Sequence, residues 1–488
     1  MTLDPDTCHR ALAARDRRFD GLFFVGVRTT GIYCRPVCPA RTPGRDRCVF
    51  FGRAAEAERQ GFRACLRCRP ELAPGSGPLD AVPRLVTAAV ARIEAGALNQ
   101  ASVEGLAATL GVTGRHLRRA LVAGLGLTPV ELAQTRRLAL ATQLLHDTRL
   151  PLGEVALAAG FRSLRRFNAL FRARFGRPPS ALRRAPGLAA GRGGPGEGAI
   201  TLRLDHRPPL DWAALLEFLS ARSIAGVEEV VGGGWRRTVR LGRRTGWVEV
   251  TADPARPALR ARVSLSLAGA LMPLTARLRA LFDLDARPDA VAAHLGRDPT
   301  LRASLRRHPG LRVPGAFDGF EAALRVVLGQ QVTVRAATTV SGRLAAALGE
   351  PVETPFPALG RLAPTPEAVA AAGEGRLAAL GMPGARARAL LALAGAVAGG
   401  GLRLERHAGP ESLEALRALP GVGDWTAQVV AMRALGDPDA FPAADLGVLR
   451  ALGAASPRQA AARAAAWSPW RAYATVHLWH LPHRGAGR

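Results

Sequence analysis

The sequence has 488 residues, of which 48% are hydrophobic, and this is enough apolar material for several folded domains. Its 67 basic and 39 acidic residues give a formal net charge of +28, and every one of these basic residues is arginine because the sequence contains no lysine. The charge favours a polyanion such as DNA as the partner, and since no apolar run reaches membrane-spanning length we expect a cytoplasmic protein.

All six cysteines lie in the first 68 residues, and four of them are spaced as Cys34-x3-Cys38 and Cys65-x2-Cys68. Two close pairs joined by a loop suit one tetrahedral Zn²⁺, with each thiolate about 2.3 Å from the ion. A disulfide framework is the alternative, and we expect no secretory signal segment that would support it. Cys8 and Cys48 fall outside the spacing and are expected to be packed or free thiols. The sequence predicts a small α/β zinc domain in residues 1–75.

Residues 81–185 follow a helical pattern that contains an internal repeat. Ala107-x3-Gly111 and Ala156-x3-Gly160 lie 49 residues apart, and each comes shortly before a helix-capping residue and a basic helix. This repeat predicts two helix-turn-helix units, with Thr113 and Ser163 as the caps.

The second basic helix has two distinct faces. Phe167, Leu170 and Phe171 recur at helical spacing and are expected to face the core. The outward face then contains the residues predicted to contact DNA, namely Arg165, Arg166 and Asn168. A basic face that is only solvated is the alternative.

The rest of the sequence changes character twice. Residues 186–199 are rich in Gly, Ala, Arg and Pro and are expected to form a flexible linker. Residues 200–270 alternate between apolar and polar positions, which predicts a small strand-rich α+β domain. Residues 271–485 are rich in Ala and Leu and predict an all-α domain. The expected fold is therefore multidomain and mainly α.

A glycine-rich hairpin, Leu419-Pro-Gly421-Val-Gly423, lies between two helical stretches. Gly421 and Gly423 allow main-chain N–H groups at a helix start to approach a DNA phosphate, and the loop carbonyls can hold a monovalent cation. Non-specific DNA binding by a bare helix-hairpin-helix is the alternative to an enzyme.

The segments Val27-Arg-Thr-Thr-Gly-Ile-Tyr-Cys34-Arg-Pro-Val-Cys38 and Gly61-Phe-Arg-Ala-Cys65-Leu-Arg-Cys68 resemble the zinc domain of Ada-type methylphosphotriester repair proteins. The resemblance implies that Cys34 accepts a methyl group from a methylated DNA phosphate and that the Zn²⁺ ligands are Cys34, Cys38, Cys65 and Cys68. Methylation would change the formal charge of the zinc centre from about −2 to about −1 and tighten DNA binding. Arg35 and Arg67 are predicted to hold phosphates nearby. A purely structural zinc site is the alternative.

Residues 82–185 resemble the AraC-type regulators, most clearly over Gly160-Phe-Arg-Ser-Leu-Arg-Arg-Phe-Asn-Ala-Leu-Phe-Arg-Ala-Arg-Phe-Gly176. Two recognition helices on one rigid unit would enter successive major grooves of promoter DNA. Beside a methyl acceptor, this implies a transcription activator of alkylation-repair genes, with RNA polymerase as a further partner.

The hairpin, Leu328-Gly-Gln-Gln-Val-Thr-Val334, Phe441-Pro-Ala-Ala-Asp445 and Trp470-Arg-Ala-Tyr-Ala-Thr-Val-His-Leu-Trp479 resemble the helix-hairpin-helix DNA glycosylases of the 3-methyladenine glycosylase II (AlkA-like) branch. The resemblance covers about residues 200–485 and implies that Asp445 is the catalytic carboxylate. Trp425 and Trp479 match aromatic positions of the base pocket, and Gln331 stands where the family inserts an apolar side chain into DNA. A helix cap is the ordinary alternative for Asp445, and core packing is the alternative for the tryptophans.

The chemistry of base excision agrees with this set of residues. Cleavage of an N-glycosidic bond gives the sugar oxocarbenium character, which a carboxylate stabilises, and an alkylated purine leaves without a strong general acid. Strand-nicking glycosylases commonly need an amine for a Schiff base, and arginine cannot supply it. We therefore expect a monofunctional glycosylase that acts on double-stranded DNA. The alternatives are a non-catalytic regulator, or a glycosylase whose zinc domain is purely structural.

Overall fold

The computed structural model describes residues 4–75, 84–183 and 198–481. Contacts divide the chain into two compact units, residues 1–208 with 253–276 and residues 209–252 with 277–488. The division falls within helix α11 (Leu271–Leu281). The predicted linker, residues 186–199, lies outside the described residues except for its last two positions. Among the described helices, none has the length and apolar character that a membrane crossing requires.

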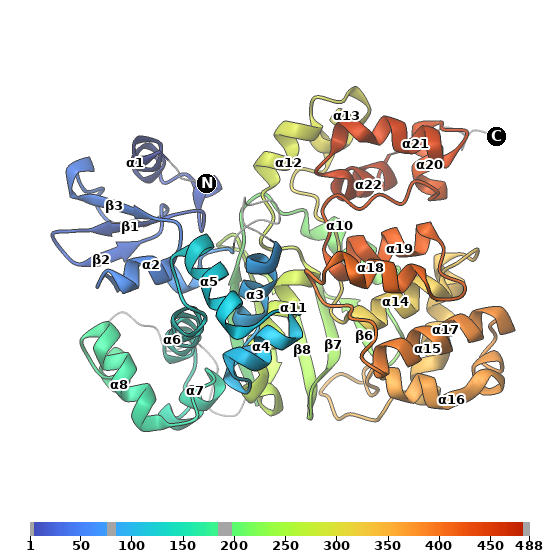
Figure 1. The fold of residues 1–488 in the computed structure, drawn as a ribbon, viewed down its shortest axis with the longest axis horizontal. Coiled ribbons are helices and arrows are strands. Elements are labelled where there is room, and N and C mark those ends of the chain that lie inside the picture. Colours follow the sequence, from blue (N-terminus) through green and yellow to red (C-terminus); the bar gives the residue numbers. More distant parts are fainter. Residues whose placement is uncertain (1–3, 76–83, 184–197, 482–488) are drawn as a thin grey trace. The chain divides into compact units, whose positions relative to one another are not determined.

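The first unit begins with the zinc segment, residues 4–75, in which a four-stranded sheet has the order β3-β1-β2-β4 (Figure 1). Strand β1 pairs antiparallel with β2 and β3, whereas β2 and β4 are parallel. Gly26 permits close packing on β1, because an added Cβ would lie 2.8 Å from the rings of Phe51 and Phe62. The elements are α1 (Pro5–Ala13), β1 (Phe24–Val27), β2 (Ile32–Cys34), β3 (Cys48–Phe51), α2 (Ala54–Arg59) and β4 (Arg63–Ala64).

The helix-turn-helix segment, residues 84–183, contains the two predicted units. The side chain of Thr113 accepts a hydrogen bond from the main-chain N–H of His116, and Ser163 accepts one from Arg166, so both predicted caps are confirmed. The helices are α3 (Arg84–Glu94), α4 (Val103–Thr109), α5 (Gly114–Leu125), α6 (Pro129–Asp147), α7 (Leu152–Ala158), α8 (Leu164–Phe175) and α9 (Pro179–Arg183).

Two strands of the predicted strand-rich region also belong to the first unit. Strand β5 (Ala199–Asp205) pairs antiparallel with β9 (Ala258–Ser264), from Ala199 opposite Ser264 to Asp205 opposite Ala258. Alternate residues of β5 are buried, beginning with Ile200, as a strand with one covered face requires. Asp205 therefore lies on the other face of the strand.

The second unit combines an antiparallel run of three strands with a large set of helices. Strand β7 (Gly234–Leu241) pairs with β6 (Glu228–Val231) and β8 (Arg244–Ala252). The helices are α10 (Trp212–Ser220), α12 (Pro288–Leu295), α13 (Pro299–Arg307), α14 (Gly319–Leu328), α15 (Val334–Leu348), α16 (Pro366–Ala378), α17 (Gly384–Ala398), α18 (Pro410–Arg417), α19 (Asp424–Val430), α20 (Leu446–Leu452), α21 (Pro457–Ala464) and α22 (Arg471–Trp479).

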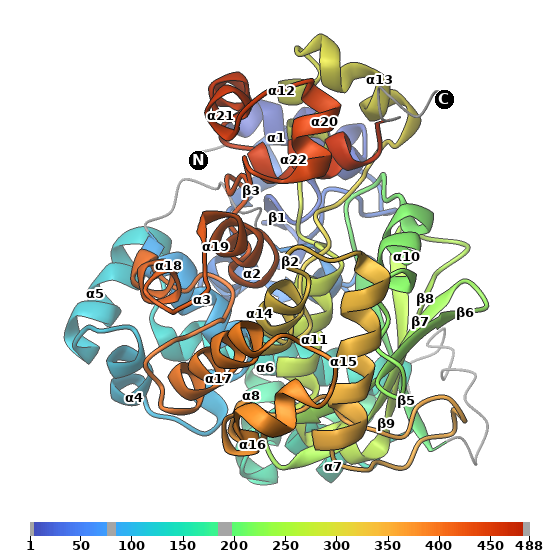
Figure 2. The same cartoon turned by 90° about the vertical axis from the view of Figure 1, so that its right-hand side faces the viewer.

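One hydrophobic core runs through the helices of the second unit and includes residues of α14, α17, α19, α20 and α22. Helix α14 contributes a nearly continuous buried stretch, and Figure 2 shows it among α15, α17 and α19. This core fixes the ends of α19, α20 and α22 relative to one another. The prediction of a multidomain, mainly α protein with small strand groups is confirmed.

Candidate metal centre and candidate active site

The four spaced cysteines meet because β2 and β4 are parallel neighbours. Tyr33 stands opposite Ala64 in this pairing, so the chain leaves both strands at the same edge, at Cys34 and Cys65. The second member of each pair, Cys38 or Cys68, then turns back toward the first. All four sulfur atoms lie within 4.8 Å of one another, and all four residues are buried.

This cluster fits a tetrahedral Zn²⁺. Four sulfurs about 2.3 Å from a zinc ion stand roughly 3.8 Å apart, within the spread that the structure shows. The six cysteines form no disulfide, so the disulfide alternative is wrong. Cys8 and Cys48 do not belong to the four-sulfur cluster, and burial raises the pKa of the Cys8 thiol to about 11 and also raises that of Cys48.

The sulfurs of the cluster differ in their hydrogen bonds. The main-chain N–H of Arg35 lies 3.4 Å from the Cys68 sulfur and donates to it. Because such a bond draws charge from a thiolate, this contact lowers the nucleophilicity of the Cys68 sulfur.

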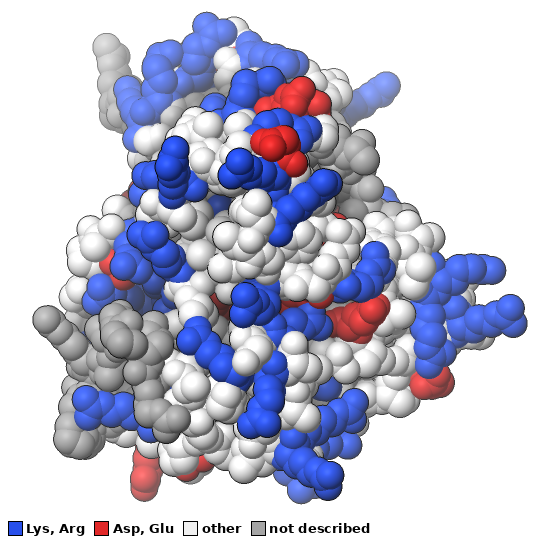
Figure 3. All heavy atoms as spheres, turned by 90° about the vertical axis from the view of Figure 1, so that its left-hand side faces the viewer, with Lys and Arg blue, Asp and Glu red and all other residues white. Residues whose placement is uncertain are grey.

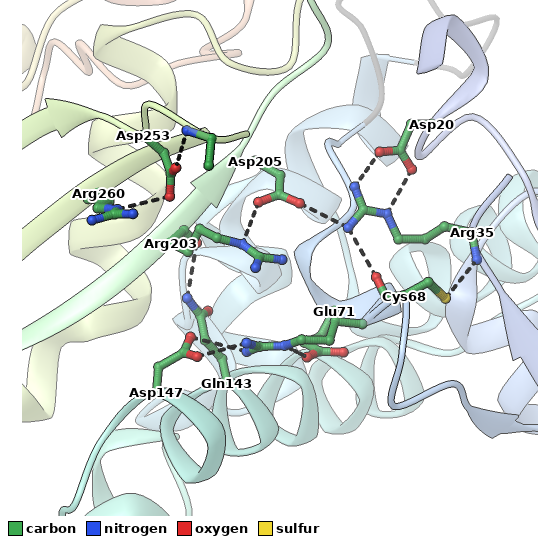
Figure 4. Close-up of polar contacts among 12 residues, drawn as sticks. Asp20, Arg35, Cys68, Glu71, Gln143, Asp147, Arg203, Asp205, Asp253 and Arg260 are labelled. Carbon is green, nitrogen blue, oxygen red and sulfur yellow. Dashed lines mark hydrogen bonds and ion pairs between the residues drawn. The ribbon is translucent and has the colours of Figure 1, made fainter. Parts of the chain in front are cut away.

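The two arginines predicted to hold phosphates have different surroundings. Arg67 is exposed, which agrees with its prediction without testing it. Arg35 is only 5% exposed, and its guanidinium donates to Asp20, to Asp205 and to the carbonyl of Cys68 (Figure 4). In this structure Arg35 is therefore unavailable to a DNA phosphate, because buried acidic partners already occupy its donors.

A buried carboxylate, Glu58 of α2, connects the zinc segment to the helix-turn-helix segment. Tyr33, the residue before Cys34, donates to it at 2.9 Å, and Thr135 of α6 donates at 2.6 Å. Arg174 of α8 forms a 2.9 Å ion pair with the same carboxylate. Burial raises the pKa of Glu58, and the charge of Arg174 opposes that shift. One acid thus joins the neighbour of Cys34 to the second basic helix.

The second basic helix, α8, has the two faces that its sequence predicts. Phe167 and Phe171 are fully buried and Leu170 is half-buried. The predicted DNA-contacting residues Arg165, Arg166 and Asn168 are exposed, and their contact with DNA stays a prediction. The face of the molecule in Figure 3 carries many basic and few acidic side chains, as a surface for a polyanion requires.

Asp445 lies where three elements of the second unit meet. It is the N-cap of α20, since its Oδ1 accepts from the main-chain N–H of Val448 at 3.1 Å. The indole N–H of Trp425, in α19, donates to Oδ2 at 3.0 Å. The indole N–H of Trp479, at the end of α22, donates to Oδ1 at 3.0 Å. Asp445 is thus a helix cap, as the ordinary alternative states, and also a carboxylate held by two indoles.

Aromatic and cationic groups lie beside the Trp479 indole that binds this carboxylate. The ring of Phe218, in α10, is nearly parallel to that of Trp479, at 14° with centroids 6.2 Å apart. The guanidinium of Arg222 lies 3.8 Å from the centre of the Phe218 ring, and that of Arg433 lies 4.9 Å from it. Burial lowers the pKa of Arg222 to about 10, against the opposing charge of Asp445, and lowers that of Arg433 to about 9.

The hairpin requires glycine at position 421 for two reasons. The φ of Gly421 is +77°, and an added Cβ would lie 2.8 Å from Ala389. Gly423 is the N-cap residue of α19, and an added Cβ there would meet open space. The side chain of Gln330 donates to the Gly421 carbonyl at 2.8 Å and to Thr426 at 2.9 Å. The hairpin is thereby tied to the loop that follows α14.

Gln331 occupies an exposed position in that loop with a left-handed φ of +56°. The next apolar side chains, Val332 and Val334, are 40% and 42% exposed. The loop therefore presents a polar side chain that is followed by exposed apolar ones, and insertion of Gln331 into DNA stays a prediction.

Several of these residues were not predicted as site residues, namely Phe218, Arg222, Gln330 and Glu58. Gln330 had a signal, because the motif Leu328-Gly-Gln-Gln-Val contains two neighbouring amides and either could act. Phe218 and Arg222 are far from Asp445 in the sequence, and nothing local connects them to it.

Known protein families match four parts of the chain. The matches are the metal binding domain of Ada at residues 7–71, a helix-turn-helix domain at 106–185, the AlkA N-terminal domain at 201–318, and the HhH-GPD superfamily of base excision DNA repair proteins at 324–470. The resemblances found in the sequence are therefore confirmed.

Curated relatives match the chain over different lengths. It is 44% identical to the "Probable bifunctional transcriptional activator/DNA repair enzyme AlkA" of Mycobacterium tuberculosis, over 98% of this chain and 96% of the relative. The "DNA-3-methyladenine glycosylase 2" of Escherichia coli is 36% identical over 57% of this chain and 96% of its own length. The "Bifunctional transcriptional activator/DNA repair enzyme Ada" of Escherichia coli is 38% identical over 26% of this chain and 34% of its own length.

Proposed function

The chain belongs to the family of AlkA-type bifunctional transcriptional activators and DNA repair enzymes, and from this premise we propose that it responds to alkylation damage in three ways. It excises alkylated purines of the 3-methyladenine type, accepts a methyl group from DNA phosphotriesters on Cys34, and regulates transcription. Double-stranded DNA is the partner in each case.

The geometry at Asp445 carries the excision proposal. Two indole N–H groups and one main-chain N–H fix the carboxylate. Positive charge develops on the sugar as the N-glycosidic bond breaks, and a fixed carboxylate stabilises that charge while water attacks C1′. The alkylated purine carries positive charge before cleavage and leaves as a neutral base, so the site needs no strong acid. Since the sequence has no lysine, we propose a monofunctional glycosylase.

Base-release chromatography on methylated duplex DNA tests this proposal. Asp445→Asn should lose at least about 100-fold in excision rate and keep its DNA affinity, because only the transition-state charge loses its partner. A wild-type protein that binds methylated DNA but releases no base would instead support the non-catalytic regulator.

The methyl-transfer proposal rests on the sulfur of Cys34. Cys34, Cys38, Cys65 and Cys68 would hold Zn²⁺, and the bound ion would keep their thiolates deprotonated at neutral pH. The Cys34 sulfur attacks the methyl carbon of a methylphosphotriester, forming an S–C bond as the C–O bond breaks. The electron pair of the broken bond stays on the phosphate oxygen, which restores the phosphodiester anion.

Mass spectrometry of the protein after incubation with methylated DNA tests the acceptor. The wild type should gain one methyl group, confined to Cys34, and Cys34→Ser should gain none. A wild type that stays unmodified would leave the zinc segment with a structural function only.

The regulatory proposal rests on the exposed basic face of α8 and on its connection to Tyr33 through Glu58. We propose that methylation of Cys34 reduces the negative charge beside DNA and raises affinity for promoter DNA, with RNA polymerase as the next partner. Gel-shift titrations of methylated and unmethylated protein should differ in Kd, and equal values would reject the switch. We propose a cytoplasmic location, because thiols stay reduced there and the proposed DNA partner is present.

The hairpin carbonyls remain the proposed site of a monovalent cation. The Gly421 carbonyl already accepts from Gln330, so one of its two lone pairs is used. DNA binding by the wild type should then be stronger in K⁺ than in the bulky tetramethylammonium ion at equal ionic strength.

A further inference from the structure

A residue of the AlkA-type part of the chain reaches the zinc segment. Asp205 ends β5 and lies inside the AlkA N-terminal match, residues 201–318, and outside the Ada match, residues 7–71. Its Oδ2 accepts from Nη1 of Arg35 at 2.9 Å (Figure 4). The two side chains are 12% and 6% exposed, so this ion pair is shielded from solvent.

Arg35 is fixed from several directions at once. Its Nε donates to Asp20 at 2.8 Å, and its Nη1 donates to the carbonyl of Cys68 at 3.3 Å as well as to Asp205. Its main-chain N–H donates to the Cys68 sulfur. The orientation of the Arg35 side chain therefore affects the peptide that follows Cys34 and a sulfur of the cluster.

Asp205 is itself held in place by the first unit. Its Oδ1 accepts from Arg203 at 2.8 Å, and the carbonyl of Arg203 accepts from Gln143 of α6 at 3.0 Å. The alternation of β5 places Asp205 on the face opposite the buried Ile200. The carboxylate is thus presented to Arg35 by a paired strand and not by a free loop.

Charge explains why both acids are needed. A guanidinium that is 6% exposed is costly unless carboxylates and carbonyls satisfy it, and Asp20 alone leaves Nη1 with only a carbonyl at 3.3 Å. Groups that support metal ligands from outside tune affinity and reactivity of the centre.

We propose that Asp205 is a positioning residue of the methyl-acceptor centre, acting through Arg35 on Cys68 and on the backbone beside Cys34. Strand β5 of the AlkA-type part is then a required support of the acceptor, and the two activities share one structural element. This inference rests on the proposed methyl transfer to Cys34.

The test compares three variants of the full chain loaded with zinc. Asp205→Asn removes the charge, Asp205→Glu keeps it, and Asp253→Asn is the matched control. Asp253 is a similarly buried acid of the same unit, but its partners are Arg260 at 2.9 Å and the main chain of Ala255 (Figure 4). The measurements are zinc release to a chromophoric chelator, methyl transfer to Cys34, and the visible spectrum after Co²⁺ replaces Zn²⁺.

Asp205→Asn should release zinc about tenfold faster and accept a methyl group about tenfold more slowly. These effects are at the lower end of the range for residues that support metal ligands, because Asp20 still holds Arg35. Its cobalt spectrum should shift, whereas Asp205→Glu and Asp253→Asn should stay near the wild type. A wild type that is methylated, beside an Asp205→Asn protein that matches it in all three measurements, rejects this inference alone. Faster transfer in Asp205→Asn also rejects it, because Arg35 would then serve as a phosphate contact that Asp205 restrains. A wild type that never gains a methyl group rejects the proposed methyl transfer to Cys34, and this inference with it.

Discussion

Replacing Trp425 with phenylalanine removes one hydrogen-bond donor from Asp445 and keeps an aromatic ring. Among the described residues, the Trp425 indole is the donor to Oδ2, whereas Oδ1 accepts from both Trp479 and the N–H of Val448. Trp425→Phe therefore leaves one carboxylate oxygen without its donor, while Trp479→Phe leaves each oxygen with one. We expect Trp425→Phe to slow base excision more than Trp479→Phe.

The size of the effect follows from the strength of one such bond. A hydrogen bond to a charged group contributes about 1.5 to 3 kcal/mol, and each 1.4 kcal/mol or so of transition-state stabilisation changes the rate about tenfold. If the donor acts through the orientation of Asp445, Trp425→Phe should lose about 10- to 150-fold in the single-turnover rate. Trp479→Phe should lose about tenfold or less, because Val448 still holds Oδ1 and the ring still faces Phe218.

The assay is single-turnover release of 3-methyladenine from methylated duplex DNA, quantified by chromatography. Trp212→Phe is the matched control, since its indole donates to the carbonyl of Gly233 at 3.0 Å and has no contact with Asp445. A Trp425→Phe enzyme with the wild-type rate, or one that loses no more than Trp212→Phe, would refute the argument. The tryptophans would then act on the base or the core and not on the carboxylate.

Three further perturbations have defined outcomes. Gly421→Ala places a Cβ 2.8 Å from Ala389 at a φ of +77° and should destabilise the hairpin by about 1 to 3 kcal/mol and weaken DNA binding, whereas Gly423→Ala, which meets open space, should change thermal stability little. Burial lowers the pKa of His477 to about 4. The free energy of unfolding should therefore be highest above pH 6.5, where the imidazole is neutral in both states, and should fall by up to about 3 kcal/mol as the pH drops to 4. Urea titrations of His477→Gln should show a smaller loss over that range. Metal removal by a chelator should abolish amide protection in residues 20–70, because the ion that would join the four cysteines and stabilise the fold is gone, and retained protection would contradict the four-cysteine site.

The sequence predicted those features whose determinants are local. The cysteine spacing sufficed to predict the metal cluster, because each close pair supplies two ligands and one ion can join the two pairs. The caps Thr113 and Ser163 followed from residue type and position. Asp445 and its two tryptophans were found by resemblance, although the predicted function of the indoles was to face the base and the structure shows them binding the carboxylate.

Features that depend on long-range pairing could not be predicted in this way. Arg35 lies directly beside a cysteine of the predicted zinc site, a context that favours an exposed phosphate contact, and only the position of β5 explains its burial against Asp205. Phe218 reaches the Trp479 ring from a helix that precedes the strands of the second unit. In both cases tertiary packing determines the partner, and the sequence near either residue does not predict it.

The shared carboxylate of Glu58 has a practical meaning for protein engineering. Tyr33 comes from the zinc segment, and Thr135 and Arg174 come from two helices of residues 84–183, yet all three depend on the same two oxygens. A chimera that combined residues 84–183 with a foreign sensor lacking an acid at this position would leave the partly buried guanidinium of Arg174 and the hydroxyl of Thr135 without this partner. A domain exchange between relatives should therefore keep Glu58 together with its three donor residues, and the two sequences should be joined at a point that does not separate them.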